Sequence, residues 1–300
     1  MIERIAYAGW PHCYRLSDGQ LEAVATGDVG PRIVRLGFVN GKNVFGGLEE
    51  GLGQTGGDEW RLYVGHRFWH APEANPRSYY PDNEPIQVEA TGNTLTLTPP
   101  LEKTTGIQKT LSLSLAAGRF TATHTLRNDG VWPVQLAPWA LSVMATNGVA
   151  IVPQPQAPDP TALLPNRTIR LWPYADMADR RWHWGTKFIT LRQDPQGGGP
   201  TKFGTNGSDG WCAYWNEGLL FLKRYDYQAG AAYPDNGCTI ECYTNPRFLE
   251  LETLGPLVWL EPGRSVSYVE RWYLFAGVKM DVSSEESIAA ALAPILQQAV

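Results

Sequence analysis

The sequence predicts an all-β protein, a large antiparallel β-sandwich that ends in one short helix. Segments of strand length, in which apolar residues alternate with polar ones or run together, recur from the first residues to residue 275. Turn signals such as Asn40-Gly41 and Pro262-Gly263 separate these segments. Because helical patterns do not alternate with the strands, an α/β design is excluded. We expect residues 1–300 to form a single domain.

Eight segments carry the clearest strand pattern: residues 20–26, 32–39, 94–98, 111–117, 119–126, 219–225, 248–254 and 266–275. One convincing helix is predicted over 283–298, where Ser283 or Ser284 serves as the N-cap and acids fill the first turn.

Two stretches interrupt this rhythm. Residues 51–85 are rich in Gly, Pro, Trp, Tyr and His, and residues 153–210 are rich in Pro, Gly and Asn. Long loops in a compact domain are usually functional or disordered, and the aromatic content argues against disorder. We therefore expect ordered loops that cover one end or one face of the sandwich.

Composition limits the partners. The formal net charge is −5, with acids and bases interspersed, which argues against nucleic acid as a partner. Twelve tryptophans is a high count, and although most will pack in the core, the excess suits a protein that stacks flat ligands or sugar rings. Four cysteines are too few for a disulfide scaffold, and a lone Cys-x3-Cys pair makes zinc improbable. We expect neither a metal nor a cofactor.

The first residues alternate apolar and polar side chains and do not resemble a secretory signal. No run approaches 18 consecutive apolar residues, so no membrane span is expected. These features predict a cytoplasmic location, unless a leader has been removed. The oligomeric state cannot be derived from the sequence.

Residues 65–73, GHRFWHAPE, contain two histidines, an arginine, two aromatics and a glutamate. As a helix, this stretch would set His66 and His70 one turn apart for a metal ion, but Pro72 opposes helical geometry. As a strand, it separates the two histidine backbones by roughly 13 Å, which is awkward for one zinc ion. A polar, aromatic cleft fits better, with the histidines and Arg67 bonding hydroxyl groups and Trp69 stacking on a pyranose. A purely structural histidine is the alternative.

Glu250 and Glu252 lie two residues apart in a predicted strand and share one face. If this face lines a cleft, burial raises the pKa of a carboxyl group and makes it a base near neutral pH. The alternative is a solvent-facing side of the strand.

The tetrapeptide Tyr-Pro-Asp-Asn occurs twice, at residues 80–83 and 233–236. It predicts two type I turns with proline at the second position. Alternatively, Asp82 or Asp235 faces a ligand.

Several of these segments resemble the galactose mutarotase-like superfamily. LELETLGPLVWLEPGRSVSYVERWYLF, residues 249–275, is similar to the C-terminal part of aldose 1-epimerases, and GGDEW followed by GHRFWHAPE resembles their sugar-facing glycine region and arginine loop. A more specific resemblance is carried by four segments taken together: DVGPRIVRLGF, GHRFWHAPE, YPDNG and ELETLGPL. As a set, they are similar to an uncharacterised bacterial family of that superfamily.

The resemblance implies a large β-sandwich with a sugar cleft on a concave sheet face. It places the catalytic base at Glu252 and a substrate-binding arginine at Arg67. The epimerase acid is a histidine, but PVQLAPWALSV puts Trp139 at the matching place. His66, His70 or His183 would have to supply the acid.

Three hypotheses follow. The first is an enzyme that interconverts sugar anomers, with Glu252 as base and His66 or His70 as acid. In this hypothesis Arg67 binds hydroxyl groups, and Trp69 or Trp139 stacks on the sugar ring. The second is a carbohydrate-binding protein without turnover. The third is a glycoside hydrolase or lyase acting on an oligosaccharide, for which Glu73, Asp82 or Glu250 would supply a second acid.

Overall fold

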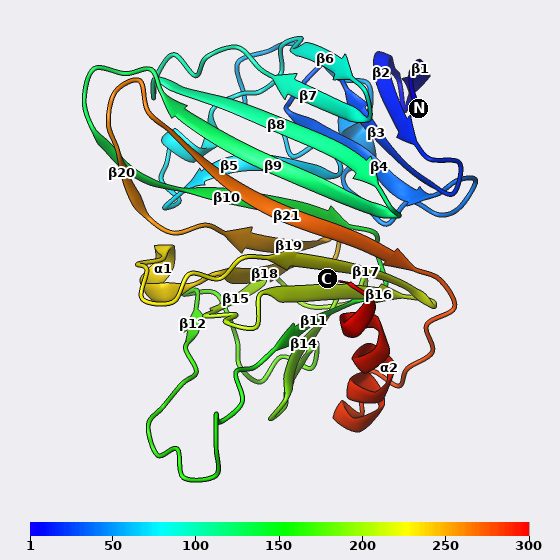
Figure 1. Cartoon of the computed structure of the whole chain (residues 1–300), viewed down its shortest axis with the longest axis vertical. Coiled ribbons are helices and arrows are strands. Elements are labelled where there is room, and N and C mark those ends of the chain that lie inside the picture. The colour runs from blue at the N-terminus through cyan, green and yellow to red at the C-terminus, as the bar shows by residue number, and fades with distance from the viewer. Residues whose placement is uncertain (300) are drawn as a thin grey trace.

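The computed structural model describes residues 1–299. Two large antiparallel sheets pack against each other (Figure 1). Sheet A consists, in spatial order, of β1 (Ile2–Tyr7), β2 (Trp10–Ser17), β3 (Leu21–Thr26), β4 (Arg32–Phe38), β5 (His66–Ala71), β10 (Val134–Met144), β19 (Leu249–Leu254), β18 (Ile240–Thr244), β15 (Thr201–Thr205) and β12 (Ile169–Leu171), and β20 (Val258–Leu260) pairs with β10 outside this order.

Sheet B consists, in spatial order, of β13 (Trp182–Trp184), β14 (Phe188–Arg192), β11 (Val149–Pro153), β16 (Trp211–Asn216), β17 (Leu219–Tyr225), β21 (Ser265–Phe275), β9 (Arg119–Asn128), β8 (Ile107–Ala116), β7 (Thr94–Thr98) and β6 (Gln87–Thr91). The all-β sandwich predicted from the sequence is confirmed.

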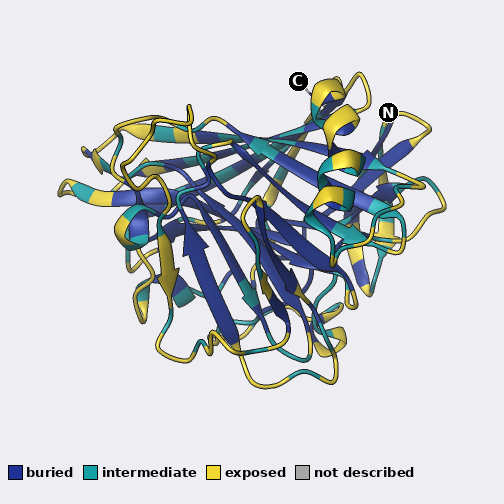
Figure 2. Cartoon of the chain, turned by 90° about the horizontal axis from the view of Figure 1, so that it is seen from below, coloured by how far each residue is buried: buried dark blue, intermediate teal, exposed yellow. Residues whose placement is uncertain are grey.

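The main core lies between the two sheets. Leu36 and Leu251 of sheet A and Leu111 and Phe221 of sheet B belong to one buried apolar cluster. In β8, every second side chain is buried, as the alternating sequence predicts. Figure 2 shows buried residues concentrated in the strands and exposed ones on the loops and on one side of α2.

Helix α2 (Glu285–Gln298) confirms the predicted C-terminal helix. The Ser284 side chain accepts a hydrogen bond from the Ser287 backbone N–H and caps the helix. The helix buries Ile288 and Leu292 against sheet B, in a cluster that includes Leu222.

The expectation of a long loop over residues 153–210 is wrong in part, because this stretch contains β12, β13, β14 and β15. These strands are only three to five residues long, and the Pro- and Gly-rich segments between them hide their pattern. Residues 51–85 contain β5 and the short 3₁₀ helix η2 (Arg77–Tyr79), while η1 (Glu49–Gly51) overlaps their start.

Within residues 1–299, the structure has no helix with the length and apolar character needed to cross a membrane. The four cysteines are free and buried.

Candidate functional site

The two faces of β5 have different neighbours. The stretch is a strand, as Pro72 predicts, and successive side chains point to opposite sides of sheet A. Phe68 belongs to an apolar cluster with Leu126 of sheet B, so its face is the interior of the sandwich. Arg67 and Trp69 point to the outer face of sheet A.

A cleft of about 370 Å³ lies on this outer face. Its wall is formed by apolar, aromatic and charged side chains from β5, β10, β15, β18, β19 and the loops beside them: Leu48, Trp60, Leu62, Arg67, Trp69, Glu73, Tyr79, Trp139, Leu141, Tyr174, Lys202, Tyr243, Phe248 and Glu250. The volume is within the lower range of pockets that take small ligands.

Aromatic rings form one side of the cleft. The ring of Trp69 meets that of Trp139 edge to face, with centroids 5.3 Å apart and an interplanar angle of 76°. Trp60 and Tyr79 also pack edge to face against Trp69, with ring centroids 5.5 Å and 5.3 Å from that of Trp69. Trp69 and Trp139 are buried, so the apolar surface that this group offers a sugar ring comes mainly from the half-buried Trp60 and Tyr79.

Arg67 and Glu250 form a buried ion pair in the cleft wall. The Nη1 atom of Arg67 donates to Oε1 of Glu250 at 2.6 Å. The guanidinium carbon also lies 4.6 Å from the centroid of the Trp69 ring, within cation–π range. Arg67 is therefore held in place by both Glu250 and Trp69, and the ion pair lies beside the aromatic residues of the wall.

Glu252 lies directly behind the cleft wall and is fully buried. Strand register explains its position, because Leu141 on β10 pairs with Arg67 on one side and with Glu252 on the other. The next strand places Glu241 directly opposite Glu252. Two carboxylates thus face each other in the middle of sheet A.

Lys202 of β15 holds these two carboxylates together. Its Nζ lies 2.7 Å from Oε2 of Glu241 and 3.1 Å from Oε2 of Glu252. The indole N–H of Trp139 donates to the same Glu252 oxygen at 2.8 Å, and Oε1 of Glu252 is buried without a hydrogen-bond partner. Lys202 and Trp139 therefore separate Glu252 from the open cleft.

Burial and charge shift the pKa values in this group. Burial raises the pKa of Glu252 above its ordinary value, and the Lys202 ammonium only partly offsets this. The pKa of Glu241 is raised well above its ordinary value for the same reason, with Glu252 adding repulsion. Burial by itself would lower the pKa of Lys202, but both carboxylates outweigh it and raise that pKa well above normal.

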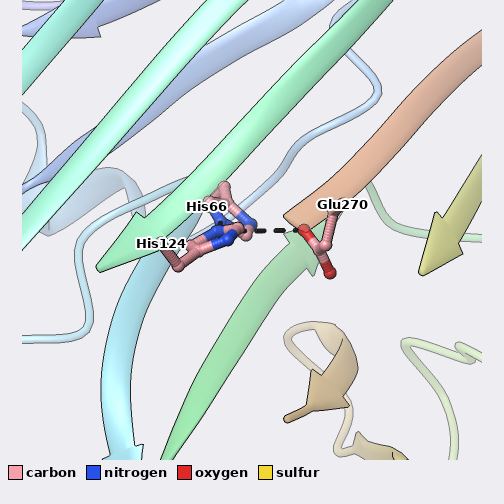
Figure 3. A group of neighbouring side chains, drawn as sticks. All are labelled: His66, His124 and Glu270. Atoms are coloured by element: carbon pink, nitrogen blue, oxygen red, sulfur yellow. Dashed lines mark hydrogen bonds and ion pairs between the residues drawn. The ribbon is translucent and has the colours of Figure 1, made fainter. Parts of the chain in front are cut away.

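The structure does not bring His66 to the cleft. Its ring lies between the sheets, where Nδ1 is 2.8 Å from the Ser142 hydroxyl and Nε2 is 2.7 Å from Nε2 of His124 (Figure 3). His124 Nδ1 lies 3.2 Å from the carbonyl oxygen of Tyr268, which can only accept. One tautomer set satisfies the chain: His124 donates to Tyr268, His66 to His124, and Ser142 to His66.

Among residues 1–299, His66, His124 and Glu270 are the group of side chains whose possible metal-ligand atoms all come within 4.8 Å of one another. The two imidazole nitrogens are closer than the roughly 3.3 Å expected for two ligands of a tetrahedral zinc ion with Zn–N bonds of about 2.0–2.1 Å. Glu270 already accepts from Lys223, Thr253 and Trp272. The arrangement fits a hydrogen-bonded network better than a ligand set.

Four other residues considered in the sequence also lie away from the cleft wall. His70 is buried and bonds through Nε2 to Glu102 at 3.0 Å, and Asp82 pairs with the buried Arg32 at 2.9 Å. His183 is exposed on β13, in sheet B. Asp235 lies in α1 (Pro234–Gly237) and does not line the cleft, although its charge adds to the raised pKa of Glu241 behind the wall.

The type I turn expected at Asp235 is wrong, because φ is +51° at Asp235 and +59° at Asn236. Type I geometry needs negative φ at both central positions, whereas short polar side chains tolerate the left-handed region.

The structure brings together Arg67, Trp69, Glu73, Trp139 and Glu250 in the cleft wall, with Glu252 behind it. Sequence reasoning missed Lys202, Glu241 and Tyr243. The sequence signal that could have found them is the alternation in residues 201–205, TKFGT, and 239–244, TIECYT. In these short strands Lys202, Glu241 and Tyr243 point to the outer face of sheet A.

Neither a protein-family model nor a curated protein matches the sequence. Solved structures do match. The chain is similar to the Slr1438 protein from Synechocystis sp. PCC 6803, with a TM-score of 0.59 and 13% identity over 91% of this chain and 99% of that one.

It is also similar to a galactose mutarotase-like protein from Lactobacillus casei, with a TM-score of 0.56 and 10% identity over 87% of this chain and 99% of that one. A galactose mutarotase-like protein from Clostridium acetobutylicum gives 0.53 and 10% over 92% and 98%. These likenesses show the galactose mutarotase-like fold, which the sequence predicted.

Proposed function

We propose that the cleft on sheet A binds a monosaccharide, or the reducing end of an oligosaccharide, and that the protein interconverts its anomers by general acid–base catalysis. One observation carries the proposal: a buried carboxylate, Glu252, lies against the aromatic wall of a cleft on a galactose mutarotase-like sheet.

The cleft combines the two kinds of contact that a pyranose needs. Trp60 and Tyr79, half-buried beside the buried Trp69 and Trp139, supply apolar surface for the C–H face of the ring. Arg67 and Glu250 supply charged donors and acceptors for its hydroxyl groups. Carbohydrate binding uses this combination of stacking and directed hydrogen bonds.

Anomer interconversion needs a base and an acid on one sugar. In our proposal Glu252 removes the proton of the anomeric hydroxyl, the C1–O5 bond breaks, and the Lys202 ammonium protonates O5. The open-chain aldehyde then turns about its C1–C2 bond. Ring closure on the other face of C1 returns the O5 proton to Lys202 and the Glu252 proton to O1.

The pKa directions support these roles unequally. The raised pKa of Glu252 moves this carboxyl toward the range in which a base is effective at neutral pH. The raised pKa of Lys202 makes it a weak acid. We therefore expect the acceleration of anomer exchange to lie toward the lower end of the about 10²–10⁴-fold that a general acid or base provides.

The experiment is anomer exchange of free aldoses, followed by NMR magnetisation exchange. We expect wild-type protein to accelerate the exchange and Glu252→Gln to reduce the acceleration by about 10²–10⁴-fold. Glu261→Gln, an exposed glutamate in the turn after β20, is the matched control and keeps the wild-type rate. No acceleration with a broad panel of aldoses removes the catalytic proposal.

A second candidate, carbohydrate binding without turnover, is favoured by one specific observation. Glu252 is covered by Trp139 and Lys202, so a sugar reaches it only by displacing the indole hydrogen bond. Calorimetry and NMR together distinguish the candidates. Sugar binding that survives Glu252→Gln, together with wild-type protein that does not accelerate anomer exchange, selects this second function.

A further inference from the structure

Both cations in the cleft wall already have partners. Arg67 is paired with Glu250 at 2.6 Å and lies over the Trp69 ring. Lys202 contacts Glu241 and Glu252, and its Nζ lies 5.0 Å from the centroid of the Trp139 ring. An incoming carboxylate or phosphate would have to replace a buried ion pair in order to be neutralised, which is costly.

Carboxylates outnumber cations in this region. Among residues 1–299, the charged side chains in the cleft wall and directly behind it are the cations Arg67 and Lys202 and the carboxylates Glu73, Glu241, Glu250 and Glu252. Burial raises the pKa of both Glu241 and Glu252. Arg67 is neutralised by Glu250, and Lys202 by Glu241 and Glu252, so among the described residues Glu73 is the charged group of the wall that is left without a counter-charge, and its carboxylate attracts positive charge to the cleft.

Glu73 is the carboxylate best placed to meet a ligand. It is exposed and lines the cleft, and it accepts a hydrogen bond from the Tyr79 hydroxyl. In the part of the chain that the structure describes, no ion pair is formed by Glu73, in contrast to Glu250. Burial raises the pKa of Tyr79 to about 12, and Glu73 adds to this, so the phenol stays a neutral donor.

We infer that the cleft selects sugars that carry an amino group and rejects sugars that carry a carboxylate or a phosphate, an inference that rests on the proposed carbohydrate function. Glu73 is the specificity-determining residue and pairs with the ammonium group. Trp60 and Tyr79 add to this preference, because aromatic faces also attract ammonium groups.

The test is isothermal titration calorimetry with four matched probes at about pH 6.5 and low salt: D-glucose, D-glucosamine, D-glucuronate and glucose 6-phosphate, repeated with D-galactose, D-galactosamine and D-galacturonate. We expect the amino sugar of either series to bind about fivefold more tightly than its neutral parent. The anionic sugars bind at least about tenfold more weakly. Added salt reduces both differences.

The Glu73→Gln variant keeps a hydrogen-bond acceptor for Tyr79 but removes the charge, and it brings the amino-to-neutral affinity ratio toward one. Glu89→Gln, an exposed glutamate on β6 in sheet B, retains the wild-type ratio. Equal binding of amino and neutral sugars, or anionic sugars that bind as tightly as neutral ones, overturns the inference and leaves the proposed function standing. Failure of every sugar to bind overturns the proposed function itself.

Discussion

Lys202 is the residue on which the charge balance behind the cleft depends. It is the shared partner of Glu241 and Glu252, both fully buried and directly opposite each other in the sheet. Like charges opposite each other destabilise a strand pair unless a counter-charge lies between them. The same lysine that we propose as an acid therefore also stabilises the fold.

We predict that Lys202→Met lowers the free energy of unfolding by about 3–5 kcal/mol, because it leaves buried carboxylates without their counter-charge. Urea denaturation measures this change. Lys42→Met, which breaks the exposed pair of Lys42 with Glu217, is the matched control and changes stability by less than about 0.5 kcal/mol. Similar losses in both variants would contradict this account of Lys202.

Glu241→Gln provides a second check on the same balance. Carboxylates are in excess here, so removing one of them costs less stability than removing the lysine. A larger loss in Glu241→Gln than in Lys202→Met would show that the buried negative charge is not in excess.

Single residues in the cleft could be predicted only in part. In a strand over residues 66–71, alternate side chains point to opposite faces of the sheet. Every one of these residues is buried, so a contrast between apolar and polar positions does not show which face is the outer one. His66 and His70 carry chemistry as suggestive as that of Arg67 and Trp69. The interior face is the one that packs against sheet B, and the strands of sheet B that it contacts are distant in sequence, so this contact cannot be derived from residues 66–71 alone.

At the level of elements, β5, β9 and β21 meet in the hydrogen-bonded network between the sheets. His66 and His124 are hydrogen-bonded to each other and His124 to the Tyr268 carbonyl, while Glu270 lies 3.9 Å from Nε2 of His124 and accepts from Lys223 at 3.0 Å. Burial lowers the pKa of His124 to about 4, and burial together with His124 lowers that of His66 well below its ordinary value. Both imidazoles are therefore neutral in the folded protein near pH 7.

This network predicts acid destabilisation. Between pH 6.5 and about 4, the unfolded chain protonates His124 while the folded protein does not, so stability is lost as the pH falls through that window. The loss assigned to His124 is about 3 kcal/mol. Glu241 and Glu252, whose folded pKa values are raised, contribute in the opposite direction.

Urea denaturation from pH 7 to pH 4 compares wild type with His124→Gln, which removes the titration of His124 and its effect on His66 and Glu270 but leaves the contributions of Glu241 and Glu252 unchanged. Glutamine can still accept from His66 and donate to Tyr268. We expect the stability of the variant to fall less steeply with pH. Parallel curves for the two proteins would mean that His124 does not titrate as described.

Element type could be predicted where the pattern is long. β8 and β9 are ten residues each and alternate cleanly, and α2 has a capped first turn. The short strands between residues 169 and 205 could not be predicted, because three to five residues among prolines and glycines carry too little periodicity.

At the level of the whole molecule, the cleft depends on strand order in sheet A. Strands β5, β10, β19, β18 and β15 are neighbours in the sheet, although they come from widely separated parts of the sequence. This order brings Lys202 and Glu252 to the same face as Arg67. Composition and periodicity predict a sandwich, but they do not specify which strands are adjacent. Only the resemblance to a known superfamily suggested that Glu252 and Arg67 belong to one site.

The most direct test of the central claim, that this cleft binds a sugar, is a crystal structure of the protein soaked with the tightest-binding monosaccharide. We predict that the ring lies against the aromatic group of Trp60, Trp69, Tyr79 and Trp139, with hydroxyl groups within hydrogen-bond distance of Arg67 and Glu250. A sugar bound at another surface, with this cleft unoccupied at saturating concentration, would contradict the claim.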